Sequence, residues 1–351
     1  MTRSELRAKV QTVLGLVAPE DLGITLPHEH LVSDGSCWFV EPSEATEISM
    51  VHHPVTLDIL WWLRYHLFQN MDDLLLLDEQ EAIEEARRFK LAGGNSIVEL
   101  SSIGLGRDPA ALARISRATG LNVIMGSGYY LAVSHGPEMD AKTEEQISGE
   151  IVRDITVGVG DSGIRSGIIG EIGCSWPMTD NERKSLRAAA RAQQLTGAAL
   201  NVHPGQGEEA AMEIVRILDD AGADLTRTVI DHIDRAVRKS ENRIELAKTG
   251  CYLEYDLFGR EGYYPIHHRV IDLPNDAQRI NEIIEIINRG YLNQILISQD
   301  IWNKTQRCAY GGWGYAHILR DALPVMRVKG MTEEQIHMIM VENPRRLLTL
   351  V

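Results

Sequence analysis

Two histidines separated by one residue, His28 and His30, stand at the end of an apolar segment near the start of the chain. The segment predicts an N-terminal hairpin that runs into a buried strand. Side chains alternate along a strand, so both imidazoles point to one side and Glu29 points to the other. Imidazoles placed in this way can bind one divalent metal such as Zn, Fe, Ni or Cu. The pair alone is also compatible with two ordinary polar residues at a strand end.

Four more residues of ligand type stand at or just after the end of a short apolar run: Glu171, His203, His232 and Asp300. Each has an ordinary explanation on its own, such as a loop carboxylate for Glu171 or a helix cap for Asp300. If the runs are strands of one parallel barrel, their C-terminal ends share a rim. Six such residues on one rim favour a common metal site.

Six ligands exceed the needs of one tetrahedral catalytic metal and suit two metals close together. One metal would take His28, His30 and Asp300, the other would take His203 and His232, and Glu171 could bridge them. A hydroxide between two cations is a nucleophile at neutral pH, because the cations lower the pKa of bound water. The carboxylate of Asp300 can accept its proton and pass it to a leaving group. Zn is the expected metal, with Mn, Co or Fe as alternatives.

The elements that must position these residues alternate regularly along the chain. After the first strand, apolar runs predict strands at 96–100, 122–126, 167–171, 199–203, 228–232, 251–255 and 294–298. Helices are predicted at 79–92, 108–119, 141–158, 180–196, 207–221, 239–248, 277–288, 314–328 and 332–340, with a last turn after Pro344. Such alternation is typical of an α/β fold, the (β/α)8 TIM barrel, here one domain over residues 1–351. A doubly wound open sheet is the alternative, but no G-x-G-x-x-G follows the first strand.

A long insertion, roughly residues 32–77, follows the first strand and contains a helical pattern from about Leu57. It carries more apolar surface than an exposed loop should, in Trp38, Phe39, Trp61, Trp62, Tyr65 and Phe68. We expect the insertion to cover the mouth of the active site, to form a dimer contact, or both. Packing against its own barrel is the alternative.

The composition excludes several classes of partner. The chain has 35 basic and 50 acidic residues, a net charge of -15, and no basic run, which argues against nucleic acid and anionic membranes. The apolar window at 57–77 is interrupted by charged residues and does not predict a membrane span. The N-terminus does not resemble a signal peptide. Four cysteines without a C-x-x-C motif suit a cytoplasmic protein with reduced thiols.

Long motifs connect the chain to a known family. Residues 10–15 with Leu26-Pro27-His28-Glu29-His30-Leu31, together with 167–177, 202–205, 232–235, 250–259 and 310–312, resemble the phosphotriesterase family of the amidohydrolase superfamily, and most of all its phosphotriesterase-related proteins. The resemblance spans essentially the whole chain. It implies the six metal ligands named above, Asp300 as proton acceptor and homodimers. It also places Tyr130 where related lactonases carry a tyrosine close to the hydroxide; packing at the rim is the alternative for Tyr130.

Two departures from the phosphotriesterases and lactonases bear on the substrate. Those enzymes bridge their metals with a carboxylated lysine, whereas this chain has Glu171. They also carry His or Arg directly after an Asp that follows strand seven, whereas Asp256 is followed here by Leu257. The resemblance therefore implies hydrolysis of an acyl C–N or C–O bond in a carboxylic amide, ester or lactone, with small N-acyl amines as the leading idea. Organophosphate triester hydrolysis, lactone hydrolysis, and a metal-containing binding protein without activity are the alternatives.

Basic residues follow three of the strands that end at this rim. Arg235 follows strand six, Arg260 strand seven, and Lys304 and Arg307 strand eight. On an acidic protein, a basic cluster at the barrel mouth would attract an anion, and Arg binds carboxylate or sulfonate through paired hydrogen bonds. We expect one of the four to bind an anionic group of a small-molecule substrate. Pairing with nearby acids is the alternative for each.

Overall fold

Eight short parallel strands form the centre of the computed structural model, which describes residues 1–266 and 269–351. They are β3 (Thr25–Glu29), β6 (Ser96–Glu99), β7 (Asn122–Met125), β8 (Ile169–Gly173), β9 (Leu200–His203), β10 (Thr228–Ile230), β11 (Tyr252–Tyr255) and β14 (Ile295–Ile297). Their pairing runs β3-β6-β7 and β8-β9-β10-β11-β14, parallel throughout. Most of these strand residues are buried, as both faces of a parallel sheet covered by side chains and helices require.

Two junctions complete the ring. Between β7 and β8, the Gly170 amide donates to the Ser127 carbonyl at 2.7 Å. Between β14 and β3, the Ser298 hydroxyl donates to Glu29 at 2.8 Å, and the amides of Gln299 and Ile301 donate to the same carboxylate, each at 2.9 Å. Glu29 therefore points away from the barrel centre, as the strand alternation predicts, and fastens the last strand to the first.

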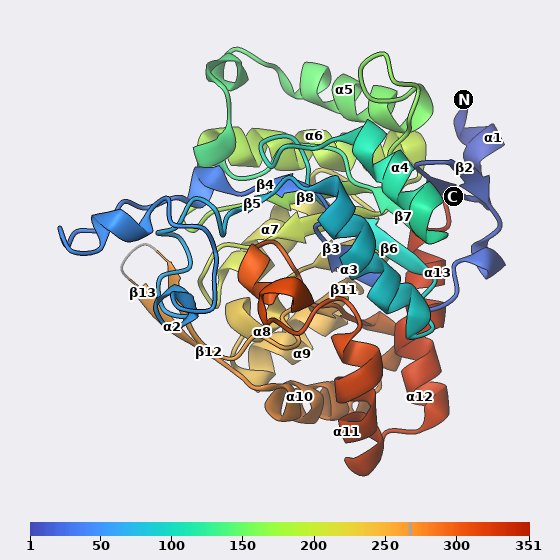
Figure 1. Ribbon diagram of the computed structural model, residues 1–351. Helices are drawn as coiled ribbons and strands as arrows, with labels where there is room; N and C mark the ends of the chain where they lie inside the picture. Colours follow the sequence, from blue (N-terminus) through green and yellow to red (C-terminus); the bar gives the residue numbers. More distant parts are fainter. Residues whose placement is uncertain (267–268) are drawn as a thin grey trace.

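Helices surround the barrel in the order of the chain (Figure 1). They are α3 (Glu79–Leu91), α4 (Pro109–Thr119), α5 (Glu144–Thr156), α6 (Asp180–Thr196), α7 (Ala210–Asp220), α8 (Ile233–Ala236), α9 (Ser240–Lys248), α10 (Asp276–Asn288), α11 (Leu323–Val328), α12 (Glu333–His337) and α13 (Asn343–Leu348). Capping boxes begin α5 at Thr143, α6 at Thr179 and α10 at Asn275. The predicted TIM barrel is confirmed, with helix ends mostly within a few residues of the expected positions.

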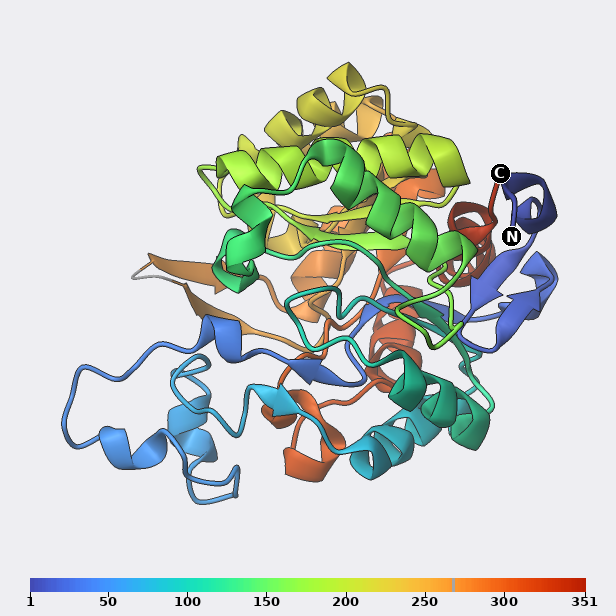
Figure 2. The ribbon, with the colours of Figure 1, turned by 90° about the horizontal axis from the view of Figure 1, so that it is seen from above.

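Beyond the barrel lie small additions at both ends of the chain. The predicted N-terminal hairpin is present as β1 (Val10–Thr12) and β2 (Gly15–Val17), after the short helix α1 (Arg3–Leu6). The two termini lie side by side (Figures 1 and 2), because Arg3 donates to the Val351 carbonyl at 2.9 Å and the Ala8 amide donates to the Leu350 carbonyl at 2.8 Å. None of the described helices is long and apolar enough to cross a membrane.

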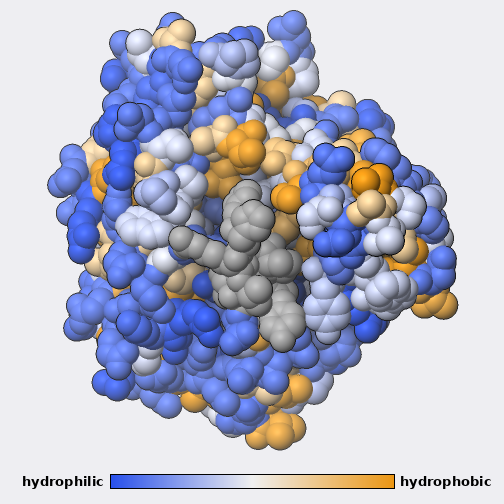
Figure 3. Space-filling model, turned by 90° about the vertical axis from the view of Figure 1, so that its left-hand side faces the viewer, coloured by the Kyte–Doolittle hydropathy of each residue, from blue (hydrophilic) through white to orange (hydrophobic). Residues whose placement is uncertain are grey.

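The insertion after β3 contains less helix than its sequence predicts. It holds the short α2 (Leu60–Leu63) and a two-stranded ladder of β4 (Ser33–Asp34) with β5 (Leu75–Leu76). Part of it packs on its own barrel: Phe68 stacks between Trp38 and Trp302, with ring centroids 5.5 and 5.6 Å away. Another part, including Trp61 at 65% exposure, faces solvent. Figure 3 shows the face on this side of the molecule as mainly hydrophilic with scattered apolar groups.

Sequence reasoning misses one hairpin. No strand is predicted between those at 251–255 and 294–298, but residues 256–274 contain an antiparallel hairpin of β12 (Gly262–Ile266) and β13 (Arg269–Leu273). The runs Tyr263-Tyr264 and Val270-Ile271 supply the aromatic and β-branched residues that favour strands. In Figures 1 and 2 this hairpin lies on the same side of the barrel as the insertion.

Candidate active site

The six residues predicted as metal ligands meet at one end of the barrel. Glu171 lies at their centre: its Oε1 is 2.5 Å from His203 Nδ1, 3.2 Å from His232 Nε2 and 3.9 Å from His28 Nε2. Asp300 Oδ1 lies 3.3 Å from His30 Nε2 and 3.6 Å from His28 Nε2. The structure therefore brings together the two groups expected from the sequence, with Glu171 between them.

Local backbone geometry turns these side chains inward. Gly170 has φ +125°, and a Cβ there would lie 2.4 Å from the Asn201 carbonyl oxygen, so glycine is required beside Glu171. His232 and Asp300 have φ values of +51° and +48°, a left-handed conformation that residues with side chains rarely adopt. Such backbone conformations concentrate at functional sites, where the surrounding structure holds them in place.

The donor set fits divalent metals. His28 Nε2 is buried and has no hydrogen-bond partner within the described residues, which leaves it able to bind a cation, while Nδ1 of the same ring faces Asp256 Oδ2 at 3.2 Å. The ligand-type atoms of His28, His30 and Asp300 lie within 4.8 Å of one another, as do those of His28, Glu171, Asp231 and His232. Imidazole nitrogens mixed with carboxylate oxygens are donors that Zn, Mn, Co and Fe accept. The assignment of individual ligands stays a prediction.

A second layer of carboxylates beneath this cluster was missed by sequence reasoning. Asp256 accepts hydrogen bonds from His232 Nδ1 at 2.8 Å and from the His232 amide at 3.0 Å. Asp231 and Glu254 are fully buried at 3.4 and 3.8 Å from His28 Nδ1. Carboxylates in this position orient metal-binding imidazoles and fix which nitrogen faces the metal. The available signal was Glu254, a charged residue inside a strand predicted to be buried.

Burial and the attraction between opposite charges shift the pKa values of the cluster residues in opposite directions. Burial lowers the pKa of His203 to about 4. Burial would also lower the pKa of His232, but the charge of Asp256 raises it to about 10. Burial opposes ionisation of Glu171, yet His203 and His232 bring the pKa of this carboxyl well below its usual value. Asp231 has a raised pKa because burial disfavours its charged form.

Tyr130 lies against this cluster. Its hydroxyl is 3.5 Å from His203 Nδ1, and Trp38 Nε1 donates to it at 3.3 Å. The side chain is 5% exposed and lines a small cavity of 30 Å³ together with Trp38 and the six predicted ligands except His28. Tyr130 is therefore close enough for its hydroxyl to contact a reacting group at the site.

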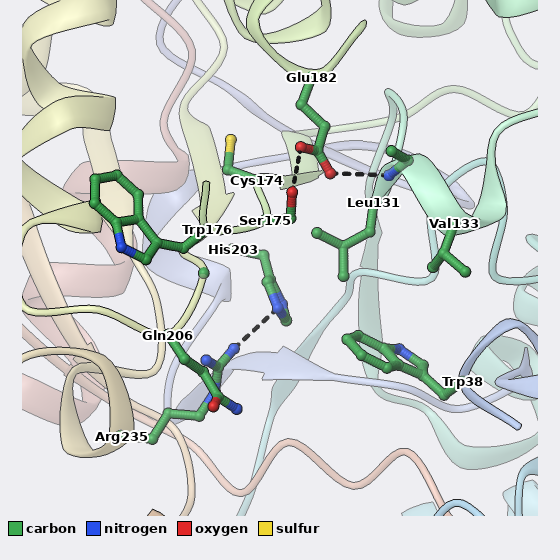
Figure 4. Close-up of a pocket in the computed structure, with 12 residues that line it drawn as sticks. Trp38, Leu131, Val133, Cys174, Ser175, Trp176, Glu182, His203, Gln206 and Arg235 are labelled. Atoms are coloured by element: carbon green, nitrogen blue, oxygen red, sulfur yellow. Dashed lines mark hydrogen bonds between the residues drawn. The ribbon is translucent and has the colours of Figure 1, made fainter. Parts of the chain in front are cut away.

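A larger cavity of 420 Å³ opens beside His203. Figure 4 shows Trp38, Leu131 and Val133 on one side of it, Trp176 and Gln206 on the other, and Arg235 below His203. Glu182, the acidic residue in its lining, accepts hydrogen bonds from Ser175 Oγ at 2.6 Å and from the Ala132 amide at 2.9 Å. His203 and Trp38 line both this cavity and the small cavity at the cluster, so the two spaces adjoin at these side chains.

The four basic residues proposed to bind substrate occupy different environments. Arg235 lines the larger cavity, and its Nη2 is 2.9 Å from His203 Nε2. Arg260 lies over the ring of Trp302 and donates to Asn303. Lys304 pairs with Asp72 at 2.6 Å. Arg307 is fully buried, pairs with Glu81 at 2.7 Å and donates to the Leu31 carbonyl. For Lys304 and Arg307 the structure favours the alternative, pairing with nearby acids, because their charges hold the rim loops together.

Comparison with known proteins identifies the family of the chain. The model of the phosphotriesterase family matches residues 8–348. The chain belongs to this family. N-acetyltaurine hydrolase of Bos taurus is 42% identical over 347 residues, covering 99% of each chain, and a phosphotriesterase-related protein of Nematostella vectensis is 44% identical over 342 residues, covering 97% of this chain and 98% of its own.

Solved structures agree with this family. A resiniferatoxin-binding protein from Rhodobacter sphaeroides matches with a TM-score of 0.94 and 37% identity, covering 98% of this chain and 96% of its own. A lactonase from Listeria monocytogenes matches with a TM-score of 0.80 and 25% identity, covering 98% and 99%. The expected resemblance is confirmed: the protein is a hydrolase of a family of binuclear metal enzymes, and it contains a cluster able to hold metal ions.

Proposed function

We propose that the protein hydrolyses the acyl C–N bond of small N-acyl amines at a binuclear metal centre. The observation that carries the proposal is the position of Glu171 between the His28, His30, Asp300 group and the His203, His232 pair. Relatives of 39–42% identity that act on N-acetyltaurine support the choice of an amide. Two bound divalent cations would supply an activated water and polarise the scissile carbonyl.

The residues of the chain would then have separate tasks. His28, His30, His203, His232, Glu171 and Asp300 would hold the metals, which we propose to be zinc. Asp300 would accept a proton from water and transfer it to the departing amine, since its carboxylate lies at the edge of the cluster beside the cavity. Tyr130 would donate a hydrogen bond to the carbonyl oxygen of the substrate.

The experiment is a metal analysis followed by a substrate screen. Protein purified without chelator and reconstituted should bind about two divalent metals per chain, as six ligands imply. It should hydrolyse N-acyl amines faster than matched esters, lactones and phosphotriesters. At most one metal after reconstitution contradicts the binuclear centre. Faster lactone hydrolysis contradicts the amide assignment and supports the second candidate, which Tyr130 and the lactonase neighbour favour.

Three further properties belong to the proposal. A single barrel domain over residues 1–351 is supported by the ring that β3 and β14 close. A cytoplasmic location is supported by four free cysteines, Cys37, Cys174, Cys251 and Cys308. A homodimer contact is supported by exposed apolar side chains on the insertion, where Leu57 is 86% and Trp61 is 65% exposed. Light scattering showing monomer alone at micromolar concentration contradicts the dimer.

A further inference from the structure

The guanidinium of Arg235 is a buried cation directly beside the candidate metal cluster. The side chain is 4% exposed, its Nη1 donates to the Pro204 carbonyl at 3.2 Å, and its Nη2 lies 2.9 Å from His203 Nε2 (Figure 4). Arginine carries hydrogen-bond donors and no acceptor. The bond between Arg235 and His203 therefore requires that His203 Nε2 accept.

The other nitrogen of the same ring faces the proposed metals. His203 Nδ1 lies 2.9 Å from His232 Nε2 and within hydrogen-bond distance of Glu171. When Nδ1 of a neutral imidazole binds a metal, the proton of the ring is on Nε2, which becomes a donor. Two donors, the Nε2–H of His203 and the guanidinium of Arg235, would then face each other. Such an arrangement is stabilised when an acceptor lies between them or beside both.

A third donor lies in the same wall of the cavity. Gln206 lines it with Arg235, and its Nε2 is buried without a hydrogen-bond partner within the described residues. The acidic residue of the lining, Glu182, also accepts a hydrogen bond from the Thr179 amide at 2.8 Å and lies on the far side of His203 in Figure 4. The wall formed by Arg235 and Gln206 is thus positively charged, rich in donors and open to 420 Å³ of space.

We infer that metal binding at His203 converts this wall into a binding site for the anionic group of the substrate, a sulfonate or carboxylate held by Arg235, Gln206 and His203 Nε2–H. The inference rests on the proposed function, because it assumes that His203 is a metal ligand. It identifies the substrate class as N-acyl amines that carry an anion a short spacer away from the amide. Since anion and metal share His203, each should raise the affinity of the other by the same factor.

The test measures anion binding without turnover. Propane-1-sulfonate is the probe and propan-1-ol its neutral control, titrated by calorimetry into metal-free and metal-loaded protein. We expect metal to tighten sulfonate binding at least about tenfold and to leave propanol unchanged, and Arg235→Gln to abolish the effect of metal. Arg235→Lys should restore part of it. Equal sulfonate affinity with and without metal overturns the inference.

Two controls separate this result from misfolding and from failure of the proposed function. Arg227→Gln removes another buried arginine, 8% exposed, which donates to the Leu347 and Thr349 carbonyls and does not line this cavity, and should leave sulfonate binding unchanged. If the Arg235→Gln protein loses its metals, Gln206→Leu becomes the test variant. Weaker sulfonate binding by Gln206→Leu protein at full metal content supports the inference, and unchanged binding overturns it. Absence of amide hydrolysis with intact metal-dependent sulfonate binding would contradict the proposed function alone.

Discussion

Replacing Asp256 with Asn tests the second layer of the site. The Asp256 carboxylate accepts from both the ring Nδ1 and the backbone amide of His232, at 2.8 and 3.0 Å, and its Oδ2 lies 3.2 Å from His28 Nδ1. An Asn side chain has one acceptor oxygen and a donor NH2 group. Its oxygen can take the place of Oδ1 or of Oδ2 but not of both, so its NH2 group faces either His232 Nδ1 or the His232 amide together with His28 Nδ1. The imidazoles of two proposed metal ligands, His28 and His232, would lose their fixed orientation.

The size of the effect follows from the number of ligands involved. Loss of such an outer partner typically weakens metal affinity by about 10- to 100-fold, which is about 1.4 to 2.8 kcal/mol. Because Asp256 contacts two ligand imidazoles, we expect Asp256→Asn to fall near the upper value. Asn has nearly the size and shape of Asp, so at this fully buried position the substitution removes charge and one acceptor without leaving a cavity.

The assay is competition of the protein with a chromogenic chelator, followed by elemental analysis after dialysis. Asp154→Asn is the matched control, since Asp154 is also buried and ion-paired, at 2.8 Å from Arg107, but lies outside the cluster. Asp256→Asn protein that holds both metals with the affinity of the unchanged protein would refute the role given to Asp256. A similar loss in Asp154→Asn would show a general effect of buried charge.

Three further outcomes are expected. Tyr130→Phe should retain both metals and lose about 100-fold in kcat; unchanged kcat in steady-state assays would leave Tyr130 a packing residue. Glu29→Gln should lower the free energy of unfolding by about 1 to 3 kcal/mol in urea titrations, because one of the donors on Glu29 loses its acceptor; an unchanged midpoint contradicts this. Asp276 and Asp321 raise the pKa of His317 against the opposing effect of burial, so stabilisation by His317 is complete below its unfolded pKa of about 6.5 and is lost as pH rises through the folded value. His317→Gln should therefore cost about 1 kcal/mol below pH 6.5 and progressively less as the pH rises, and a cost that does not change with pH refutes the assignment.

The parts of the site that sequence reasoning found share one property: their position follows from periodicity. His203 and His232 stand directly at the ends of apolar runs, and a parallel barrel places all such ends on one rim. The role of Asp256 was missed because this residue follows the strand predicted at 251–255, and its contact is with the ring of His232, which follows the neighbouring strand. The spacing of residues along the sequence gives no indication of the contact between Asp256 and His232.

The basic residues after the strands show that sequence reasoning also fails to predict the partners of long side chains. Arg235 and Arg307 both follow barrel strands, at different distances, and neither distance indicates which group the side chain contacts. Arg307 is directed away from the cavity by Glu81, a residue on α3 more than two hundred positions earlier, whereas Arg235 is held beside His203. The partner of a long, flexible side chain is a matter of tertiary packing, which a single sequence does not encode in any local pattern.

Glu29, the carboxylate that joins β14 to β3, lies between the two proposed metal ligands of β3 in the sequence. Assembly of the site therefore depends on the same strand register that closes the barrel. A shift of β3 by one residue would turn every side chain to the opposite face. Glu29 would then enter the site, both imidazoles would face β14, and the amides of Gln299 and Ile301 would lose their acceptor. The strand pairing that completes the ring therefore selects the register in which His28 and His30 point inward. A sequence change that favoured the shifted register would therefore disrupt barrel closure and the inward orientation of His28 and His30 together.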